Sequence, residues 1–110
     1  MEISLKYKNK KLGVEVFSCG FFKRFSGLMF NRREKAKILL FDFKKHVRIP
    51  IHSYFVFFPF VAVWFDNKQI IDVKMIKPSR WRVCPKKSFT KIIEIPISKK
   101  FKKEIKFFGF

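Results

Sequence analysis

The sequence has few acidic residues, few glycines and few cysteines, and each shortage excludes a kind of chemistry. Only 8 Asp and Glu stand against 26 Lys and Arg among 110 residues, which gives a formal net charge of +18. The 4 glycines lie apart at 13, 20, 27 and 109. No glycine-rich loop that could hold a nucleotide phosphate is therefore present, and nucleotide hydrolysis is not expected.

Potential metal ligands are also sparse. The two cysteines, Cys19 and Cys84, lie far apart, and the two histidines, His46 and His52, have no cysteine near them. Because a zinc site needs clustered ligands, we expect no metal and no cofactor. The cysteines are more simply two buried free thiols in a reducing compartment, with a disulfide as the alternative.

The sequence lacks a membrane-spanning run and a secretory signal. The apolar run Tyr54–Phe65 is shorter than the roughly 20 residues that a membrane helix needs, and Pro59 interrupts it. No charged segment, apolar segment and cleavage site follow Met1. We therefore expect a cytoplasmic protein, whose 110 residues form a single domain, 1–110.

What the sequence does contain is a strongly apolar stretch from Ile49 to Phe65, around which we expect the fold to form. Its aromatic and β-branched residues favour strands, and Pro59 excludes a helix. We predict two buried strands, His52–Phe58 and Phe60–Asp66, that meet at Pro59. Their continuous hydrophobicity indicates that both faces are covered.

The other predicted elements are also mostly strands. Asp66 and Asn67 are typical turn residues, and Gln69–Ile76 is predicted to return with Ile71, Val73 and Met75 on one face and Asp72 solvated on the other. The remaining predicted segments are a hairpin of Glu2–Tyr7 and Leu12–Phe17, an amphipathic helix over Phe21–Met29, strands at Ala36–Phe43 and Ser88–Ile95, a helical turn at Ser98–Lys103, and a short last strand at Ile105–Phe110. This pattern predicts a mainly β fold: a compact antiparallel barrel-like or rolled sheet with one short amphipathic helix.

No pattern of residues indicates a catalytic site, so we do not expect an enzyme. His52 and Ser53 are neighbours, but on a strand they point to opposite faces. The carboxylates are scattered, and Asp66 is more simply a turn residue.

The most basic loop, Lys77–Lys87, is the best candidate for a binding surface. We predict that it binds a polyanion, RNA above all, through Lys77, Arg80, Trp81, Arg82, Lys86 and Lys87. Trp81 could stack on a base while the arginines hold phosphates, or it could fold back over the core. The alternative is that the charge excess reflects only a composition rich in Lys and Phe.

Two other functions are compatible with the sequence. One is a small-ligand site or enzyme pocket at the mouth of the barrel, near His52 and Trp64. The other is docking of an acidic partner protein on the basic face, which an exposed apolar patch beside that face would favour.

Several short motifs, taken in order, resemble the family named domain of unknown function 192. They are Gly27-Leu28-Met29-Phe30 after Arg24, Ile38–Phe43, Ile51–Pro59 in its archaeal form, Trp64-Phe65-Asp66 with Ile70-Ile71, Lys77-Pro78, and Ile92–Pro96. The resemblance covers roughly Val14 to Phe107. It implies a compact, mainly β domain with a closed or partly closed barrel-like sheet and a short helix, and it implies no established activity.

The sequence departs from the family pattern at three places. Val61 stands where the family usually has an Asp after the central proline. Pro96-Ile97-Ser98 and Lys103-Glu104 replace a Gly and a Gly-Asp pair. Whatever those acids and glycines do elsewhere, this chain does without them.

Overall fold

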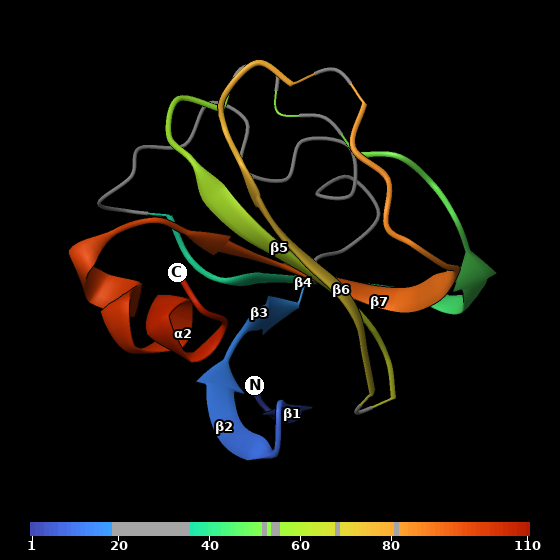
Figure 1. Ribbon diagram of the computed structural model, residues 1–110, viewed down its shortest axis with the longest axis horizontal. Coiled ribbons are helices and arrows are strands. Elements are labelled where there is room, and N and C mark those ends of the chain that lie inside the picture. The colour runs from blue at the N-terminus through green and yellow to red at the C-terminus, as the bar shows by residue number, and fades with distance from the viewer. Residues whose placement is uncertain (19–35, 52, 54–55, 68, 81) are drawn as a thin grey trace.

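The computed structural model describes residues 1–18, 36–51, 53, 56–67, 69–80 and 82–110. Within them, seven strands form one curled sheet, and a short helix lies at the C-terminus (Figure 1). The predicted mainly β fold is confirmed. The elements are β1 (Glu2–Tyr7), β2 (Lys10–Glu15), β3 (Phe17–Ser18), β4 (Leu39–Val47), β5 (Phe60–Asp66), β6 (Gln69–Ile76), β7 (Phe89–Pro96), the 3₁₀ turn η1 (Lys99–Phe101) and α2 (Lys102–Phe107). The helix predicted over Phe21–Met29 lies outside the described residues.

The sheet is mainly antiparallel, with parallel pairing near its two edges. In the described residues the strand order is β2-β1-β6-β5-β7-β4-β3. The predicted hairpin is confirmed as β1 and β2, which pair antiparallel with Lys6 opposite Lys11. β1 then joins β6 in parallel at Lys6 and Gln69, and β3 joins β4 in parallel. The hairpin thereby meets the start of β6.

Strand β5 is the centre of the sheet, as its continuous apolar sequence predicts. It pairs antiparallel with β6 on one side and β7 on the other. Val61, Val63 and Phe65 point into one hydrophobic cluster, while Phe60, Ala62 and Trp64 point into another. Both faces of β5 are therefore buried, which explains why it lacks the polar alternation of a half-exposed strand.

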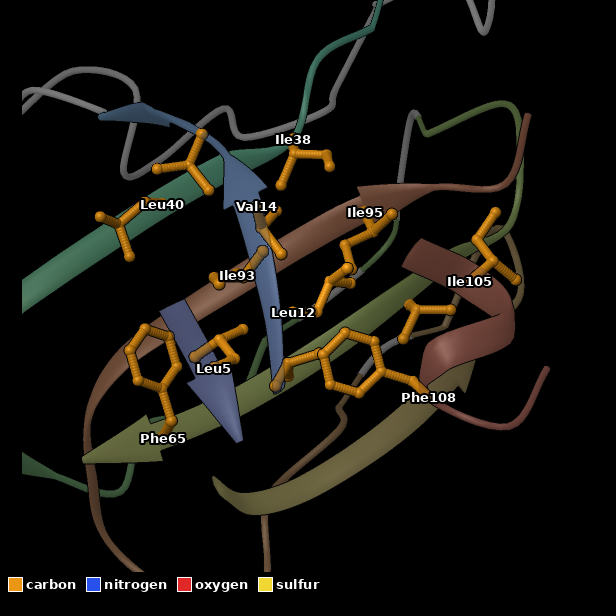
Figure 2. Packing of buried hydrophobic residues seen from close by; sticks show 13 residues of the cluster. Leu5, Leu12, Val14, Ile38, Leu40, Phe65, Ile93, Ile95, Ile105 and Phe108 are labelled. Atoms are coloured by element: carbon orange, nitrogen blue, oxygen red, sulfur yellow. The ribbon is translucent and has the colours of Figure 1, made fainter. Parts of the chain in front are cut away.

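The first cluster fills the face that the β1–β2 hairpin and α2 cover. Figure 2 shows Leu5 and Leu12 from the hairpin, Ile93 and Ile95 from β7, and Phe108 after α2 converging there. The second cluster, on the opposite face of β5, includes Leu39, Phe41, Val56, Phe58, Trp64, Phe89 and Ile92. The 17 phenylalanines of the chain provide enough apolar surface to cover both faces of β5.

The predicted orientation of β6 is wrong. The pairing register shifts between Trp64 and Phe65, so that Asp72 lies opposite Trp64 and Ile70 opposite Phe65. Ile71 is the extra residue of this irregularity, and the alternation therefore changes face there. Asp72, predicted to be solvated, is buried in consequence.

The predicted strand His52–Phe58 is also wrong for the described residues. Ser53 and residues 56–58 form no strand, and Ile51 makes only an isolated bridge with Val83. The backbone of Ser53 instead pairs with the loop after β6: its N–H donates to Arg80 O, and its carbonyl accepts from Ser79 N. These bonds replace a regular strand ladder.

The end of the chain is helical, so the predicted last strand Ile105–Phe110 is wrong. The predicted helical turn after Ser98 exists as η1, but the chain continues into α2. Ser98 precedes η1 without forming a side-chain cap. Phe101, Ile105 and Phe108 recur at helical spacing and pack on the first cluster.

Candidate functional site

The predicted basic loop, Lys77–Lys87, connects β6 to β7 and carries a group of solvent-exposed cations. These exposed side chains are Lys77, Arg80, Arg82, Lys86 and Lys87. Trp81, the predicted stacking residue, lies outside the described residues. The five described cations therefore share one loop at one end of β6 (Figure 1).

A buried hydroxyl fixes the first half of the loop. Ser53 Oγ donates to Lys77 O and accepts from Arg80 N, both at 2.6 Å. Ser53 is fully buried, and its backbone makes further bonds to Ser79 and Arg80. Because a buried polar group that is fully hydrogen-bonded is costly to disturb, these bonds hold the backbone of residues 77–80 in one conformation.

A buried carboxylate fixes the second half. Asp72 Oδ2 accepts from Lys86 N at 3.0 Å, and its Oδ1 accepts from Val73 N at 2.9 Å. Lys74 Nζ lies 3.9 Å from Asp72 Oδ2 and donates to Cys84 O. The backbone turn at residues 84–86 is thus tied to β6 by both side chains.

An arginine from outside the loop approaches the same turn. The guanidinium of Arg48 donates to Pro85 O at 3.3–3.4 Å through Nε and Nη2. Arg48 is itself exposed. It follows β4 in the chain, and it brings a sixth cation beside the five of the loop.

The alternative pocket near His52 and Trp64 has one described member. His52 lies outside the described residues. Trp64 is fully buried in the second cluster, with Lys74 Nζ 5.9 Å from its ring centroid. Its indole N–H has no hydrogen-bond partner among the described residues. The ring therefore belongs to the hydrophobic core, and its N–H is unsatisfied as far as the described residues go.

Two carboxylates elsewhere have shifted pKa values. Asp66 Oδ2 lies 2.8 Å from His46 Nε2, and its Oδ1 accepts from Thr90 Oγ1 at 3.0 Å. The hydrogen bond with His46, followed by that with Thr90, lowers the pKa of Asp66. Burial alone raises the pKa of Glu94 on β7 to about 7. Asp66 is therefore a stronger acid than an ordinary aspartate, and Glu94 is a weaker acid than an ordinary glutamate.

These titratable groups do not assemble into a metal centre. In the part of the chain that the structure describes, no three His, Cys, Asp or Glu side chains come together as ligands. Cys84 is a free thiol there, as predicted, but it is half-buried and not buried, and Cys19 lies outside the described residues.

Sequence reasoning missed an open cleft at the other end of β6. It has a volume of about 700 Å³ and is lined by Ser4, Lys6, Tyr7, Lys8, Lys11, Asp66, Asn67, Gln69 and Ile70. The lysines belong to a predicted hairpin, but the parallel contact that brings this hairpin against β6 has no sequence signal. Like-charged residues at opposed hairpin positions are the one signal that could have drawn attention to it.

Among the described residues, no helix is both long and apolar enough to cross a membrane.

The fold defines a small mainly β protein with a curled sheet, and its sequence carries a formal net charge of +18. Residues 3–106 match the profile of the family DUF192, described as "Uncharacterized ACR". The chain belongs to this family, as the short motifs indicate.

Two curated relatives are UPF0127 proteins from Pyrococcus. The Pyrococcus furiosus protein PF1050 is 31% identical over 91 residues, which cover 81% of this chain and 78% of that protein. The Pyrococcus horikoshii protein PH1112 is 32% identical over 78 residues, which cover 69% and 66% of the two chains.

Two solved structures share the fold. One, from Sinorhizobium meliloti 1021, is described as a "putative transcription regulator"; it has a TM-score of 0.72 at 16% identity, over 92% of this chain and 81% of that one. The other, a protein of unknown function from Novosphingobium aromaticivorans DSM 12444, has a TM-score of 0.71 at 8% identity, over 93% and 76%. At these identities the likeness concerns the fold alone.

Proposed function

We propose that this protein is a non-catalytic module that binds RNA through the basic loop Lys77–Lys87. The observation that carries the proposal is the combination of an anchored backbone with exposed cations. Ser53 and Asp72 hold the two halves of the loop from inside the protein. The cationic side chains that these halves carry all point to solvent.

Anchoring matters because binding has to overcome the entropy of ordering the loop. A loop whose backbone is already fixed loses less freedom when it binds a partner. The lysine and arginine side chains then need only to settle on phosphate oxygens. Arginine suits this task because its planar guanidinium can donate two parallel hydrogen bonds to one phosphate.

The charge of the whole chain supports the same proposal. A formal net charge of +18 on 110 residues produces a field that draws in polyanions from a distance. Ion pairing with Lys or Arg leaves part of the small acidic complement unused: Asp72 lies 3.9 Å from Lys74 Nζ, whereas Glu15 pairs with the N-terminal amine and Asp66 with His46. We favour RNA over duplex DNA because Trp81, which stands between Arg80 and Arg82 in the sequence, would be able to stack on an unpaired base.

Purification from the native cell tests the identity of the partner. Protein isolated without nuclease is expected to carry RNA, detected by its absorbance at 260 nm and by sequencing. Treatment with ribonuclease, but not with deoxyribonuclease, is expected to remove it. Material that survives ribonuclease and is lost with deoxyribonuclease would replace RNA by DNA as the partner.

Paired variants test the loop itself. Arg80→Gln/Arg82→Gln is expected to weaken binding of a fluorescent single-stranded RNA by about tenfold or more, since each arginine loses a charged hydrogen bond. The control variant Lys102→Gln/Lys103→Gln removes the same charge from exposed positions on α2, which packs on the first cluster and is not part of the basic loop. Equal losses in the two variants would show a diffuse charge effect and contradict a site in the loop.

The buried indole N–H of Trp64 favours a second candidate function. A ligand acceptor that reached it would satisfy a polar group that is otherwise unpaired among the described residues. This supports the pocket predicted near His52 and Trp64. A small polar ligand that shifts the indole N–H resonance of Trp64 would favour the pocket. A resonance that no candidate ligand moves would count against it.

Docking of an acidic partner protein on the basic face remains a third prediction. The large apolar side chains that are exposed among the described residues come from separate parts of the chain: Met1, Phe17, Ile49, Phe57, Met75 and Phe110. Such a partner would survive ribonuclease treatment during purification, whereas RNA would not.

A further inference from the structure

The cleft at the other end of β6 lies where two turns meet. One turn joins β1 to β2, and the other joins β5 to β6; both lie at the lower end of the sheet in Figure 1, away from the basic loop. Lys8 and Asn9 in the first turn and Asn67 in the second have positive φ angles. The parallel contact of Lys6 with Gln69 joins the two turns into one structure.

Three lysines line this cleft. Lys6 and Lys11 stand directly opposite each other across the antiparallel pair of β1 and β2, and Lys8, whose Nζ lies 5.3 Å from the centroid of the Tyr7 ring, is the third. Like charges at opposed positions of a hairpin repel each other. In the described residues none of the three has a carboxylate within 4.0 Å. An anion placed between them would turn this repulsion into attraction.

Among the described residues of the cleft, the one acidic residue already has two hydrogen-bond partners. Asp66 is held by His46 Nε2 at 2.8 Å and by the hydroxyl of Thr90 at 3.0 Å. Three lysines and one aspartate give the described residues of the lining a formal charge of +2. Asp66 therefore does not cancel the positive charge of the lysines.

The rest of the lining is suited to a ligand with more than a charge. Tyr7 is fixed by Phe107 and Phe108, with ring centroids at 6.4 and 5.5 Å. Ile70 adds apolar surface, and Ser4, Asn67 and Gln69 add hydrogen-bonding groups. A volume of about 700 Å³ lies within the range of small-molecule sites.

We infer that this cleft binds a small molecule that carries a phosphate group. Lys6, Lys8 and Lys11 would hold the phosphate as point charges, as lysine does at other phosphate sites. The amide groups of Asn67 and Gln69 and the ring of Tyr7 would contact the remainder of the molecule. The multiple charge of a phosphate matches a cleft lined by three ammonium groups better than the charge of a single carboxylate does.

This inference does not depend on RNA binding by the basic loop. The cleft includes Gln69 at the start of β6, and the loop begins after Ile76 at its end, roughly 23 Å away at the rise of a strand. Absence of binding at one site would leave the proposal for the other site unchanged. Variants in each therefore serve as controls for the other.

The test is a titration of the protein with ligand at low ionic strength, in which two-dimensional NMR monitors the backbone amides. Glucose 6-phosphate and inorganic phosphate are the probes, and glucose is the uncharged control. The inference predicts saturable shifts at residues 4–11 and at Asp66, Asn67, Gln69 and Ile70 with glucose 6-phosphate, with a Kd at or below about 1 mM. Glucose is expected to cause no shifts there.

Matched variants decide whether the lysines are responsible. Lys6→Gln/Lys11→Gln is expected to weaken glucose 6-phosphate binding about tenfold or more. Arg80→Gln/Arg82→Gln and Lys102→Gln/Lys103→Gln remove equal charge elsewhere and are expected to change it less than about twofold.

Three results would overturn the inference. They are equal losses in all three variants, shifts confined to the basic loop, and binding of glucose as tight as that of glucose 6-phosphate. A Lys6→Gln/Lys11→Gln protein with an unchanged amide spectrum outside the hairpin shows that a loss of binding does not come from misfolding.

Discussion

The hydroxyl of Ser53 accepts a hydrogen bond of 2.6 Å from the backbone N–H of Arg80. This bond joins the apolar segment before β5 to the most basic loop of the chain. The same hydroxyl donates to the carbonyl of Lys77, so one buried oxygen fixes two points of the loop. The shape of the proposed RNA-binding surface thus depends on a residue that is itself inaccessible to RNA.

Replacing Ser53 by alanine is expected to destabilise the protein and to loosen the loop. Loss of the hydroxyl leaves Lys77 O and Arg80 N without their partner, at a cost of about 1–3 kcal/mol in the free energy of unfolding measured in urea. RNA affinity is expected to fall although no charge changes. Ser88→Ala, at an exposed position of the same connection, is the control. A Ser53→Ala protein with normal stability and affinity would contradict the anchoring role.

Asp72 is expected to matter for stability in the same way. Asp72→Ala removes the acceptor for Lys86 N and Val73 N and is expected to cost about 1–3 kcal/mol. Asp72→Asn has the same shape and keeps one acceptor oxygen, so it is expected to cost less. Urea unfolding of both variants provides the measurement, and equal costs would show that the carbonyl oxygen retained by asparagine contributes nothing.

Glu94 is expected to make stability fall as the pH rises. Its pKa is about 7 in the folded protein and 4.5 as its ordinary value. Below pH 4.5 the carboxyl is protonated in both states, so its ionisation does not oppose folding. Between pH 4.5 and about 7 only the unfolded state releases its proton, and about 3 kcal/mol of stability is lost.

Glu94→Gln isolates this effect. The glutamine cannot ionise, so the stability of the variant relative to the wild type is expected to rise by about 3 kcal/mol between pH 4 and pH 8. Chemical denaturation at a series of pH values gives the difference directly. A difference that stays constant across this range would mean that Glu94 titrates normally.

For Asp66, which is hydrogen-bonded to His46, we expect the opposite dependence of stability on pH. Because hydrogen bonds to His46 and Thr90 lower the pKa of Asp66, its contribution to stability is present above pH 3.8 and is lost as the pH falls through the lowered value. An NMR titration of the Asp66 carboxyl carbon is expected to give a pKa below 3.8, and His46→Ala is expected to raise it toward 3.8. No change in His46→Ala would disprove this cause.

The sequence predicts the two central strands well because their own residues determine their conformation. Phe60–Asp66 and Gln69–Ile76 were expected as strands with the same bounds that β5 and β6 have. An unbroken run of β-branched and aromatic residues next to a two-residue turn has few other solutions. The outcome for the basic loop is similar, since two prolines without periodicity indicate a connection.

Other features depend on contacts that no local pattern records. The buried position of Asp72 follows from an irregular pairing at Trp64 and Phe65, which moves every later side chain of β6 to the other face. At the C-terminus, the spacing of Phe101, Ile105 and Phe108 does contain a helical signal, which the short length of the segment obscured. The cleft needs the hairpin to meet β6, and that contact is purely tertiary.

The most direct test of the account is the salt dependence of RNA binding. Fluorescence anisotropy of a labelled single-stranded RNA between about 50 and 200 mM KCl gives the slope of log K against log salt concentration. Five phosphate contacts predict a slope of about −3.5 for the wild type. Arg80→Gln/Arg82→Gln is expected to make it shallower by about 1.4, and Lys102→Gln/Lys103→Gln is expected to leave it unchanged. An affinity insensitive to salt, or the same slope in all three proteins, would contradict binding of RNA by this loop.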